Sequence, residues 1–191
     1  MRVISGERRG KKLLAPKGMQ TRPTADRVKE AIFNILGPDF QQFSVLDLFS
    51  GSGAMAIETL SRGASFAVII DHSQDAIVQI RRNISSCGFD DKTRIIRWNI
   101  IKNLHCLARV PDRFHLVFLD PPYRKAMIEP ALAHLIYEDK LADDARVVVE
   151  HASSESLPDH FDNLIRKDVR NYGQTAVSFY CWLGSGQQRL A

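Results

Sequence analysis

Apolar and polar residues along the chain follow two repeats, a short one typical of strands and a longer one typical of helices. In the segment 23–38, Val28, Ile32 and Leu36 fall on one face of a helix that Gly37-Pro38 ends. Further along the chain, short apolar runs alternate with helical segments. This alternation predicts a mostly parallel sheet with helices on both faces, which is the α/β class.

The apolar runs have the length of single strands, and capping residues bound the first two helices between them. Ser73 can cap the second of these helices, while Gly63 and Gly88 follow their ends. The segment 164–183 holds two β-prone runs around Asn171-Tyr172-Gly173-Gln174, which predicts an antiparallel C-terminal hairpin. The other predicted strands are 44–49, 66–71, 93–98, 115–120 and 146–151, and the predicted helices are 54–62, 73–87, 100–109 and 125–138.

The first 23 residues differ from the rest, because they are rich in Lys, Arg, Gly and Pro and contain only short β-prone runs. We expect them to form a small β-hairpin arm outside the main core. A length of 191 residues suits one domain with such an appendage. The predicted organisation is therefore an arm at 1–23, a main domain at 24–183 and a flexible tail at 184–191.

Positive charge is concentrated near the N-terminus. Residues 1–30 contain nine Lys and Arg against three Asp and Glu, whereas the rest of the chain contains 17 against 19. Such a patch favours a polyanion, most often nucleic acid. On composition alone, a solvated stretch without a partner explains it equally well. The densest part of the patch is Arg8, Arg9, Lys11 and Lys12.

Several classes of protein are disfavoured. No apolar run approaches the roughly 18 residues that a membrane span needs, and the basic N-terminus lacks the apolar stretch of a secretory signal. Cys87, Cys106 and Cys181 are odd in number and far apart, which indicates reduced thiols in a cytoplasmic protein. His72 and His151 have no third ligand at a suitable spacing, so we expect no metal.

Ligand chemistry is expected where the parallel strands end. Asp47 precedes a loop in which Gly51 and Gly53 let a ligand approach the backbone before a helix begins. Asp71 ends the next strand, where a carboxylate can accept hydrogen bonds from ribose hydroxyls, and Asn99 can pair with an adenine edge. These residues predict an adenosine-containing cofactor, and NAD fits them as well as any other. The same cofactor site is expected to include Phe49, His72, Ile100 and Asp120.

The fourth strand ends in Asp120-Pro121-Pro122-Tyr123, a turn that suits an exocyclic amine. The Asp120 carboxylate and the Pro121 carbonyl can accept the two N–H bonds of the amine, which leaves its lone pair directed at an incoming methyl group. The prolines restrict the backbone. Tyr123 offers a face for a flipped base, and we expect it to act through its ring and not its hydroxyl. Catalysis at such a turn consists mainly of positioning and electrostatic stabilisation.

With this turn, the chain resembles the class I S-adenosylmethionine-dependent methyltransferases. It resembles most closely the RsmD family of bacterial small-subunit ribosomal RNA guanine-N2 methyltransferases. The similarity runs from about residue 1 to 183 and is carried by RVISGERRGKKLLAP, TRPTADRVKEAIFN, DLFSGSGAMAIE, LDPPY and YGQTAVSFY. It implies a Rossmann-like fold with a seven-stranded sheet, S-adenosylmethionine as the methyl donor and a guanine exocyclic nitrogen as the acceptor.

The resemblance also assigns roles to single residues. Gly51 and Gly53 would line the methionine end of the cofactor, Asp71 would hold the ribose, and Asn99 would lie beside the adenine. Two departures weaken these contacts, because many methyltransferases have Asp in place of Asn99 and Glu in place of Asp71. Residues 120–123 would form the catalytic turn.

The substrate that the resemblance implies is small-subunit ribosomal RNA, in a subunit already partly assembled with ribosomal proteins. Arg22 and Thr24 belong to the RPT block, which would lie near the entrance for cofactor and substrate. The residues expected to contact RNA are therefore Arg8, Arg9, Lys11, Lys12, Arg22 and Thr24.

Three alternative functions are less compatible with the sequence. An NAD-dependent oxidoreductase would need a substrate domain after residue 150 and would leave the DPPY turn without a task. A non-catalytic RNA-binding protein with this fold would not need an intact DPPY turn. A DNA adenine-N6 methyltransferase would share the turn, but the chain is too short for the usual target-recognition insert.

Overall fold

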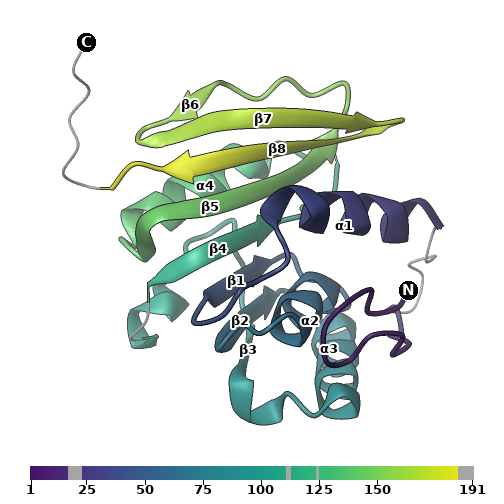
Figure 1. The fold of residues 1–191 in the computed structure, drawn as a ribbon. Helices are drawn as coiled ribbons and strands as arrows, with labels where there is room; N and C mark the ends of the chain where they lie inside the picture. Colours follow the sequence, from purple (N-terminus) through teal and green to yellow (C-terminus); the bar gives the residue numbers. More distant parts are fainter. Residues whose placement is uncertain (17–22, 111–112, 124, 185–191) are drawn as a thin grey trace. The chain divides into compact units, whose positions relative to one another are not determined.

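The computed structural model describes residues 1–16, 23–110, 113–123 and 125–184, and of residues 23–25 only the backbone. The chain divides into two compact units, an N-terminal unit at residues 1–100 and a C-terminal unit at residues 101–191. Both units contain strands and helices, coloured by position along the chain in Figure 1. The predicted domain boundaries at residues 23 and 183 stay predictions.

The sheet of the N-terminal unit has three parallel strands in the order β3-β2-β1. β1 spans Ser44–Leu48, β2 spans Phe66–Asp71 and β3 spans Thr93–Arg97. Every residue of β1 and all but the first of β2 are buried. A strand covered on both faces has no reason to alternate polar and apolar residues, which explains the continuous apolar runs. The three strands lie within one residue of their predicted bounds.

The helices of this unit are α1 at Pro23–Leu36, α2 at Ala54–Ser61 and α3 at Gln74–Cys87. The predicted caps of α3 are confirmed. The Ser73 hydroxyl accepts a hydrogen bond from the Ala76 N–H at 3.4 Å, and Gly88 closes the helix with φ 69°. A short 3₁₀ helix, η1, follows at Asp90–Lys92 and leads into β3.

The N-terminal arm, residues 1–16, packs on this unit beside α2 and α3, as the purple segment of Figure 1 shows. The expectation that the arm lies outside the core was wrong, because Val3 and Leu13 are only 1% and 4% exposed. Its hairpin has a single antiparallel bridge between Arg2 and Lys12. A Cβ at Gly6, where φ is 80°, would lie 1.7 Å from the Ser61 carbonyl oxygen of α2. Only glycine therefore permits this close approach of the arm.

The sheet of the C-terminal unit has the order β4-β5-β8-β7-β6. β4 and β5 are parallel and the remaining neighbours are antiparallel, so the predicted C-terminal hairpin, formed by β7 and β8, is confirmed. The strands are β4 at Phe114–Leu119, β5 at Leu141–Ala152, β6 at His160–Phe161, β7 at Leu164–Tyr172 and β8 at Thr175–Trp182. The helical elements are η2 at His105–Arg109 and α4 at Ile128–Tyr137.

Four elements of this unit differ from the sequence expectation, and one of them is α4, which begins at Ile128 and not at the predicted residue 125. The segment 100–109 forms only the 3₁₀ helix η2, not a longer helix. The strand β5 begins at Leu141, five residues before its predicted start. The sequence did not indicate these first residues because the exposed pair Asp143-Asp144 interrupts the apolar pattern there. The pairing of β4 with β5 also shifts register in that stretch. The two-residue strand β6 brings the strands in the described residues to eight, where the resemblance implied seven.

Candidate cofactor and substrate sites

The loop after β1 is fastened to the start of α2 by Asp47, which is only 2% exposed. The Ser50 hydroxyl donates to Asp47 Oδ2 at 2.7 Å, and the Ala56 N–H donates to the same oxygen at 3.2 Å. Burial raises the pKa of Asp47 to about 7, although both hydrogen bonds act in the opposite direction. In this structure, the side chain therefore fixes the shape of the loop in which a cofactor was expected.

The same loop contains several residues in the left-handed region of backbone conformation. Phe49 has φ 59°, Gly51 has φ 58° and Gly53 has φ 79°. This conformation suits glycine but strains an aromatic residue, and such strain concentrates at functional sites. A Cβ at Gly53 would make only ordinary contacts with Ile80 at 3.5 Å, so backbone conformation rather than space requires glycine there. The positive φ of Phe49 has no signature in the sequence.

Asp71, at the end of β2, contacts the glycine loop directly. Its Oδ2 accepts a hydrogen bond from the Gly51 N–H at 2.9 Å, and its Oδ1 accepts one from the Ser73 N–H at 2.8 Å. The two residues that the sequence separates by 20 positions are thus brought together. A carboxylate can accept about four hydrogen bonds, so Asp71, which is 7% exposed, retains unused acceptor positions, and its contact with a ribose stays a prediction.

Of the remaining predicted cofactor residues, His72, Asn99 and Ile100 lie near the ends of β2 and β3, whereas Asp120 follows β4 in the C-terminal unit. The His72 side chain is 70% exposed, and its Nδ1 lies 3.5 Å from Asp71 Oδ1. The Trp98 N–H donates to the Asp71 carbonyl at 3.0 Å, which places the segment after β3 beside the end of β2. Asn99 follows and is exposed, whereas Ile100 is buried at 2% exposure. The side chain of Ile100 therefore belongs to the core.

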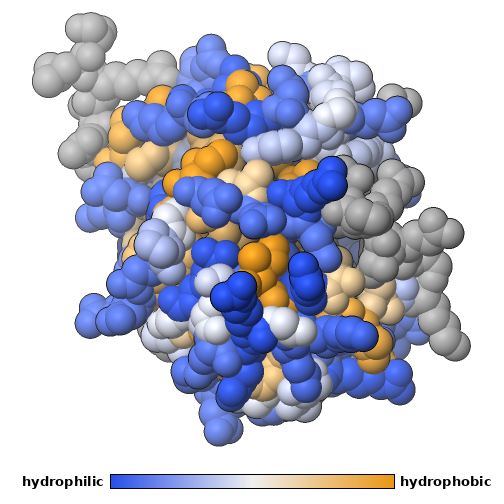
Figure 2. Space-filling view, turned by 45° about the vertical axis from the view of Figure 1, so that its right-hand side comes forward, coloured by the Kyte–Doolittle hydropathy of each residue, from blue (hydrophilic) through white to orange (hydrophobic). Residues whose placement is uncertain are grey.

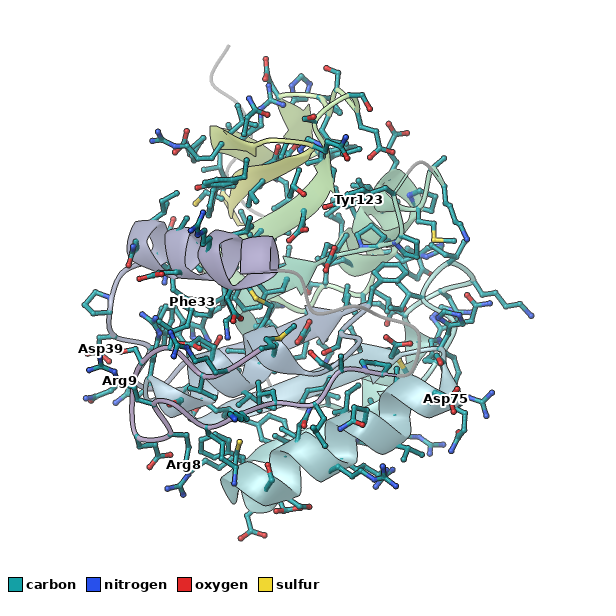
Figure 3. All side chains as sticks on the ribbon, turned by 90° about the vertical axis from the view of Figure 1, so that its right-hand side faces the viewer. Arg8, Arg9, Phe33, Asp39, Asp75 and Tyr123 are labelled. Carbon is teal, nitrogen blue, oxygen red and sulfur yellow. The ribbon has the colours of Figure 1, made fainter. Side chains whose placement is uncertain are left out.

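The predicted catalytic turn lies in the C-terminal unit, directly after β4. Asp120 is exposed, Pro121 is buried and Pro122 is exposed. Tyr123, labelled in Figure 3, is 38% exposed. The turn thus brings together an accessible carboxylate, two prolines and a partly open aromatic ring, and its catalytic role stays a prediction.

The hydroxyl of Tyr123 has partners that the sequence did not indicate. It donates to Glu150 Oε1 at 2.8 Å and lies 2.8 Å from Thr175 Oγ1. Burial raises the pKa of Tyr123, and the charge of Glu150 raises it further. Burial also raises the pKa of Glu150. The expectation that only the ring of Tyr123 matters therefore omitted a tethered hydroxyl.

Of the basic residues predicted to contact RNA, Arg8 has a structural role. Its Nε donates to the Cys87 carbonyl at the end of α3 at 2.5 Å, and its guanidinium lies 5.5 Å from the centre of the Phe89 ring. Arg9, Lys11 and Lys12 are exposed, and Figure 3 shows Arg8 and Arg9 pointing away from each other. Arg22 lies outside the described residues, and of Thr24 only the backbone, in α1, is described.

Sequence reasoning missed the group that holds the arm in place, the fully buried carboxylate of Glu58 in α2. Its two oxygens accept the N–H groups of Ile4 and Ser5 at 2.7 and 3.0 Å. They also pair with Lys29 at 3.2 Å and with Arg62 at 3.0 Å. An acidic residue on an apolar helix face was the available signal, since a buried carboxylate needs cationic or N–H partners.

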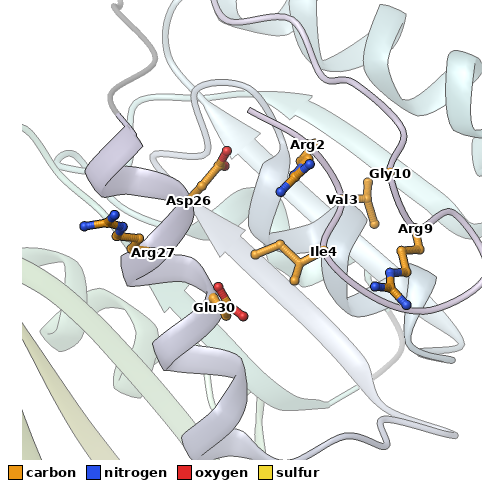
Figure 4. Close-up of a pocket in the computed structure, with 8 residues that line it drawn as sticks. All are labelled: Arg2, Val3, Ile4, Arg9, Gly10, Asp26, Arg27 and Glu30. Carbon is orange, nitrogen blue, oxygen red and sulfur yellow. The ribbon is translucent and has the colours of Figure 1, made fainter.

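A hollow of about 490 Å³ separates the arm from α1, as Figure 4 shows. Arg2 and Arg9 line it from the arm, and Asp26 and Glu30 line it from the helix. Arg27 also belongs to the lining, but its guanidinium points away from the arm in Figure 4. The Arg and the Asp and Glu side chains that line this hollow nearly balance in charge, so the positive excess of residues 1–30 is not concentrated there.

The face drawn in Figure 2 is mostly polar, and its hydrophobic residues form small separate groups. In the part of the chain that the structure describes, no helix is long and apolar enough to cross a membrane. Those same residues contain no cluster of three or more His, Cys, Asp or Glu side chains that could hold a metal ion.

Comparison with known proteins finds relatives along nearly the whole chain. Residues 1–181 match the model of a family described as Conserved hypothetical protein 95. A Bacillus subtilis protein with the provisional name rRNA methyltransferase YlbH is 37% identical over 180 residues, which cover 94% of this chain and 98% of that protein. The ribosomal RNA small subunit methyltransferase D of Escherichia coli K12 is 33% identical over 180 residues, with coverage of 94% and 89%.

A solved structure shows that the similarity extends to the fold. An Escherichia coli protein provisionally titled methyltransferase yhhF superposes with a TM-score of 0.80 and 32% identity, over 95% of this chain and 97% of that one. This agreement confirms the predicted Rossmann-like α/β class.

Proposed function

The chain belongs to the RsmD family, and from this membership we propose that it is an S-adenosylmethionine-dependent methyltransferase of small-subunit ribosomal RNA. More narrowly, we propose that the methyl group is transferred to the exocyclic N2 of a guanine. The observation that carries the proposal is the turn after β4, where Asp120 is accessible and the ring of Tyr123 is half-open and held in place.

The N-terminal unit supplies residues that fit the proposed cofactor. Asp71 has acceptor positions left for ribose hydroxyls after binding the Gly51 and Ser73 N–H groups. The glycine loop, fixed by Asp47, exposes backbone that a ligand can approach closely. S-adenosylmethionine, when bound, supplies an electrophilic methyl group.

The proposed chemistry of the turn is to hold an amine and stabilise its developing charge. Asp120 and the Pro121 carbonyl accept the N–H bonds of the exocyclic amine, so that its lone pair stays available. As the methyl group transfers, its bond to the sulfonium sulfur would break, which leaves the neutral thioether S-adenosylhomocysteine. The amine becomes acidic only at that moment, when the Asp120 carboxylate stabilises the positive charge on nitrogen and accepts the released N–H proton. Tyr123 supports the base from one face by stacking, which is worth about 1–3 kcal/mol per base.

The proposed substrate is ribosomal RNA within a partly assembled small subunit, in the cytoplasm. The exposed cations Arg9, Lys11 and Lys12 of the arm support this, because they offer contacts to phosphate groups that do not depend on sequence. Ribosomal proteins are proposed partners only in the sense that they shape the RNA substrate.

Mass mapping of small-subunit RNA from a strain that lacks this gene tests the proposal. We expect one N2-methylguanine to disappear, and a plasmid copy of the gene to restore it. An unchanged modification pattern, or the loss of a methyl group from another base, would contradict the proposed reaction.

A further inference from the structure

The late segment YGQTAVSFY contributes to the resemblance, but the proposed reaction gives it no task. In the structure, this segment ends β7 and begins β8. Thr175, the first residue of β8, reaches the hydroxyl of Tyr123 in the catalytic turn at 2.8 Å. The segment therefore touches the turn through one side chain.

Glu150 and Thr175 occupy neighbouring strands in a fixed register. In the antiparallel pair of β5 and β8, Glu150 lies opposite Val177 and Ala152 lies opposite Thr175. Glu150 and Thr175 are thus diagonal neighbours on one face of the sheet, since side chains alternate with a period of two. The phenol oxygen of Tyr123 forms a hydrogen bond with each of these two residues. Two hydrogen-bonding residues on strands hold a side chain more rigidly than residues in a loop do.

The hydrogen bonds run in one direction. The Tyr123 hydroxyl donates its single proton to Glu150 Oε1. The Thr175 hydroxyl is then the donor to the Tyr123 oxygen. The Tyr123 oxygen therefore donates one hydrogen bond and accepts another. The ring is held at its hydroxyl end by the two strands and at its Cβ end by the backbone after Pro122.

We infer that Glu150 and Thr175 are positioning residues that hold the ring of Tyr123 in the orientation for stacking on the target base. The inference rests on the proposed function. A ring fixed before the RNA binds loses little rotational freedom on stacking, and an aligned base needs less further movement before transfer. Neither residue touches the reacting atoms, so both act only through Tyr123.

The test is a double-mutant cycle in single-turnover methyl transfer. We expect Thr175→Val, Glu150→Gln and Tyr123→Phe each to lower kcat/KM for RNA by about ten-fold, as for the loss of one hydrogen bond in a charged network. The conservative variant Thr175→Ser keeps the hydroxyl and should stay near the wild-type rate. In the Tyr123→Phe background, Thr175→Val should add almost nothing, because the shared hydroxyl is already absent.

A second readout does not depend on activity. The chain has four tyrosines, so 3-fluorotyrosine labelling produces four ¹⁹F signals, and Tyr123→Phe identifies the one from position 123. Thr175→Val and Glu150→Gln should move that signal towards the position of a mobile, exposed tyrosine. The inference is overturned if the signal does not move. It is also overturned if Thr175→Val lowers methyl transfer as much in the Tyr123→Phe background as in the wild type. A wild-type protein that methylates no RNA would instead overturn the proposed function and the stacking role with it, while the spectra would still decide whether the tether exists.

Discussion

Two carboxylates hold the loop of the candidate cofactor site in shape. Asp47 fastens the loop to α2, and Asp71 fastens it to the end of β2. The sequence predicted that these residues converge, because parallel strands end at one edge of a sheet. It could not predict the tether of Tyr123, since its partners Glu150 and Thr175 lie 27 and 52 residues away. Only the register of β5 with β8 brings them together.

Asp120→Ala should separate chemistry from cofactor binding. The substitution removes an acceptor for the target amine, so the single-turnover rate should fall by roughly two to three orders of magnitude, as for one preorganised polar group. The substitution leaves Asp47, Asp71 and their hydrogen bonds to the glycine loop unchanged, so S-adenosylmethionine affinity measured by calorimetry should change little. Near-normal turnover in this variant would rule out the role assigned to Asp120.

The raised pKa of Asp47 should appear in the pH dependence of stability. Its folded pKa of about 7 lies above the unfolded value, so the folded state holds more protons between the two values and stability falls as pH rises. At about 1.36 kcal/mol per pH unit, the free energy of unfolding should fall by up to about 3 kcal/mol between pH 5 and 7. Asp47→Asn should lose this part of the dependence, as measured by urea unfolding at both pH values. Equal slopes in both proteins would show that Asp47 is ionised when folded.

At the scale of elements, buried strands and capped helices were predictable, whereas docking of the arm was not. β1, β2 and α3 follow from apolar runs and from Ser73 and Gly88. The arm has no periodic apolar pattern, and its attachment depends on N–H groups that meet Glu58 more than 50 residues away. Strand β6 consists of two residues, too short for any alternation to mark it.

Glu58→Ala should release the arm and destabilise the protein. It leaves Lys29, only 4% exposed, without its buried partner, which typically costs about 3–5 kcal/mol. Urea unfolding measures this loss, and hydrogen exchange at Ile4 and Ser5 measures release of the arm. The double variant Glu58→Gln/Lys29→Met serves as a control, because it removes the buried charges of Glu58 and Lys29 together. It should recover much of the stability, since the remaining cation, Arg62, still lies over the Phe33 ring. Unchanged exchange at Ile4 and Ser5 in Glu58→Ala would contradict the anchoring role.

At the scale of the whole molecule, the positive excess of residues 1–30 divides into structural and available charge. Lys29 is buried beside Glu58, and Arg8 is bound to the end of α3. Arg9, Lys11 and Lys12 are exposed. Composition alone counts all of these cations equally, so the sequence could indicate a basic segment but not that Lys29 and Arg8 already have partners within the protein.

Neutralising Arg9, Lys11 and Lys12 should weaken RNA binding at all sequences alike. The slope of log K against log salt should fall by up to roughly 0.7–0.9 for each lost phosphate contact. A matched control neutralises the exposed lysines Lys92, Lys102 and Lys167. Its slope should be steeper than that of the variant without the three arm cations. Filter binding at several salt concentrations measures both. The same slope in the two triple variants would show that net charge, and not the arm, determines RNA affinity.

The most direct test of the account is the identity of the product formed by the purified protein. Small subunits isolated from cells that lack the enzyme are incubated with labelled S-adenosylmethionine, and the nucleosides are analysed by mass spectrometry. We expect N2-methylguanosine with the wild type and almost none with Asp120→Ala. A labelled N6-methyladenosine, no labelled nucleoside with the wild type, or equal product from both proteins would contradict the account.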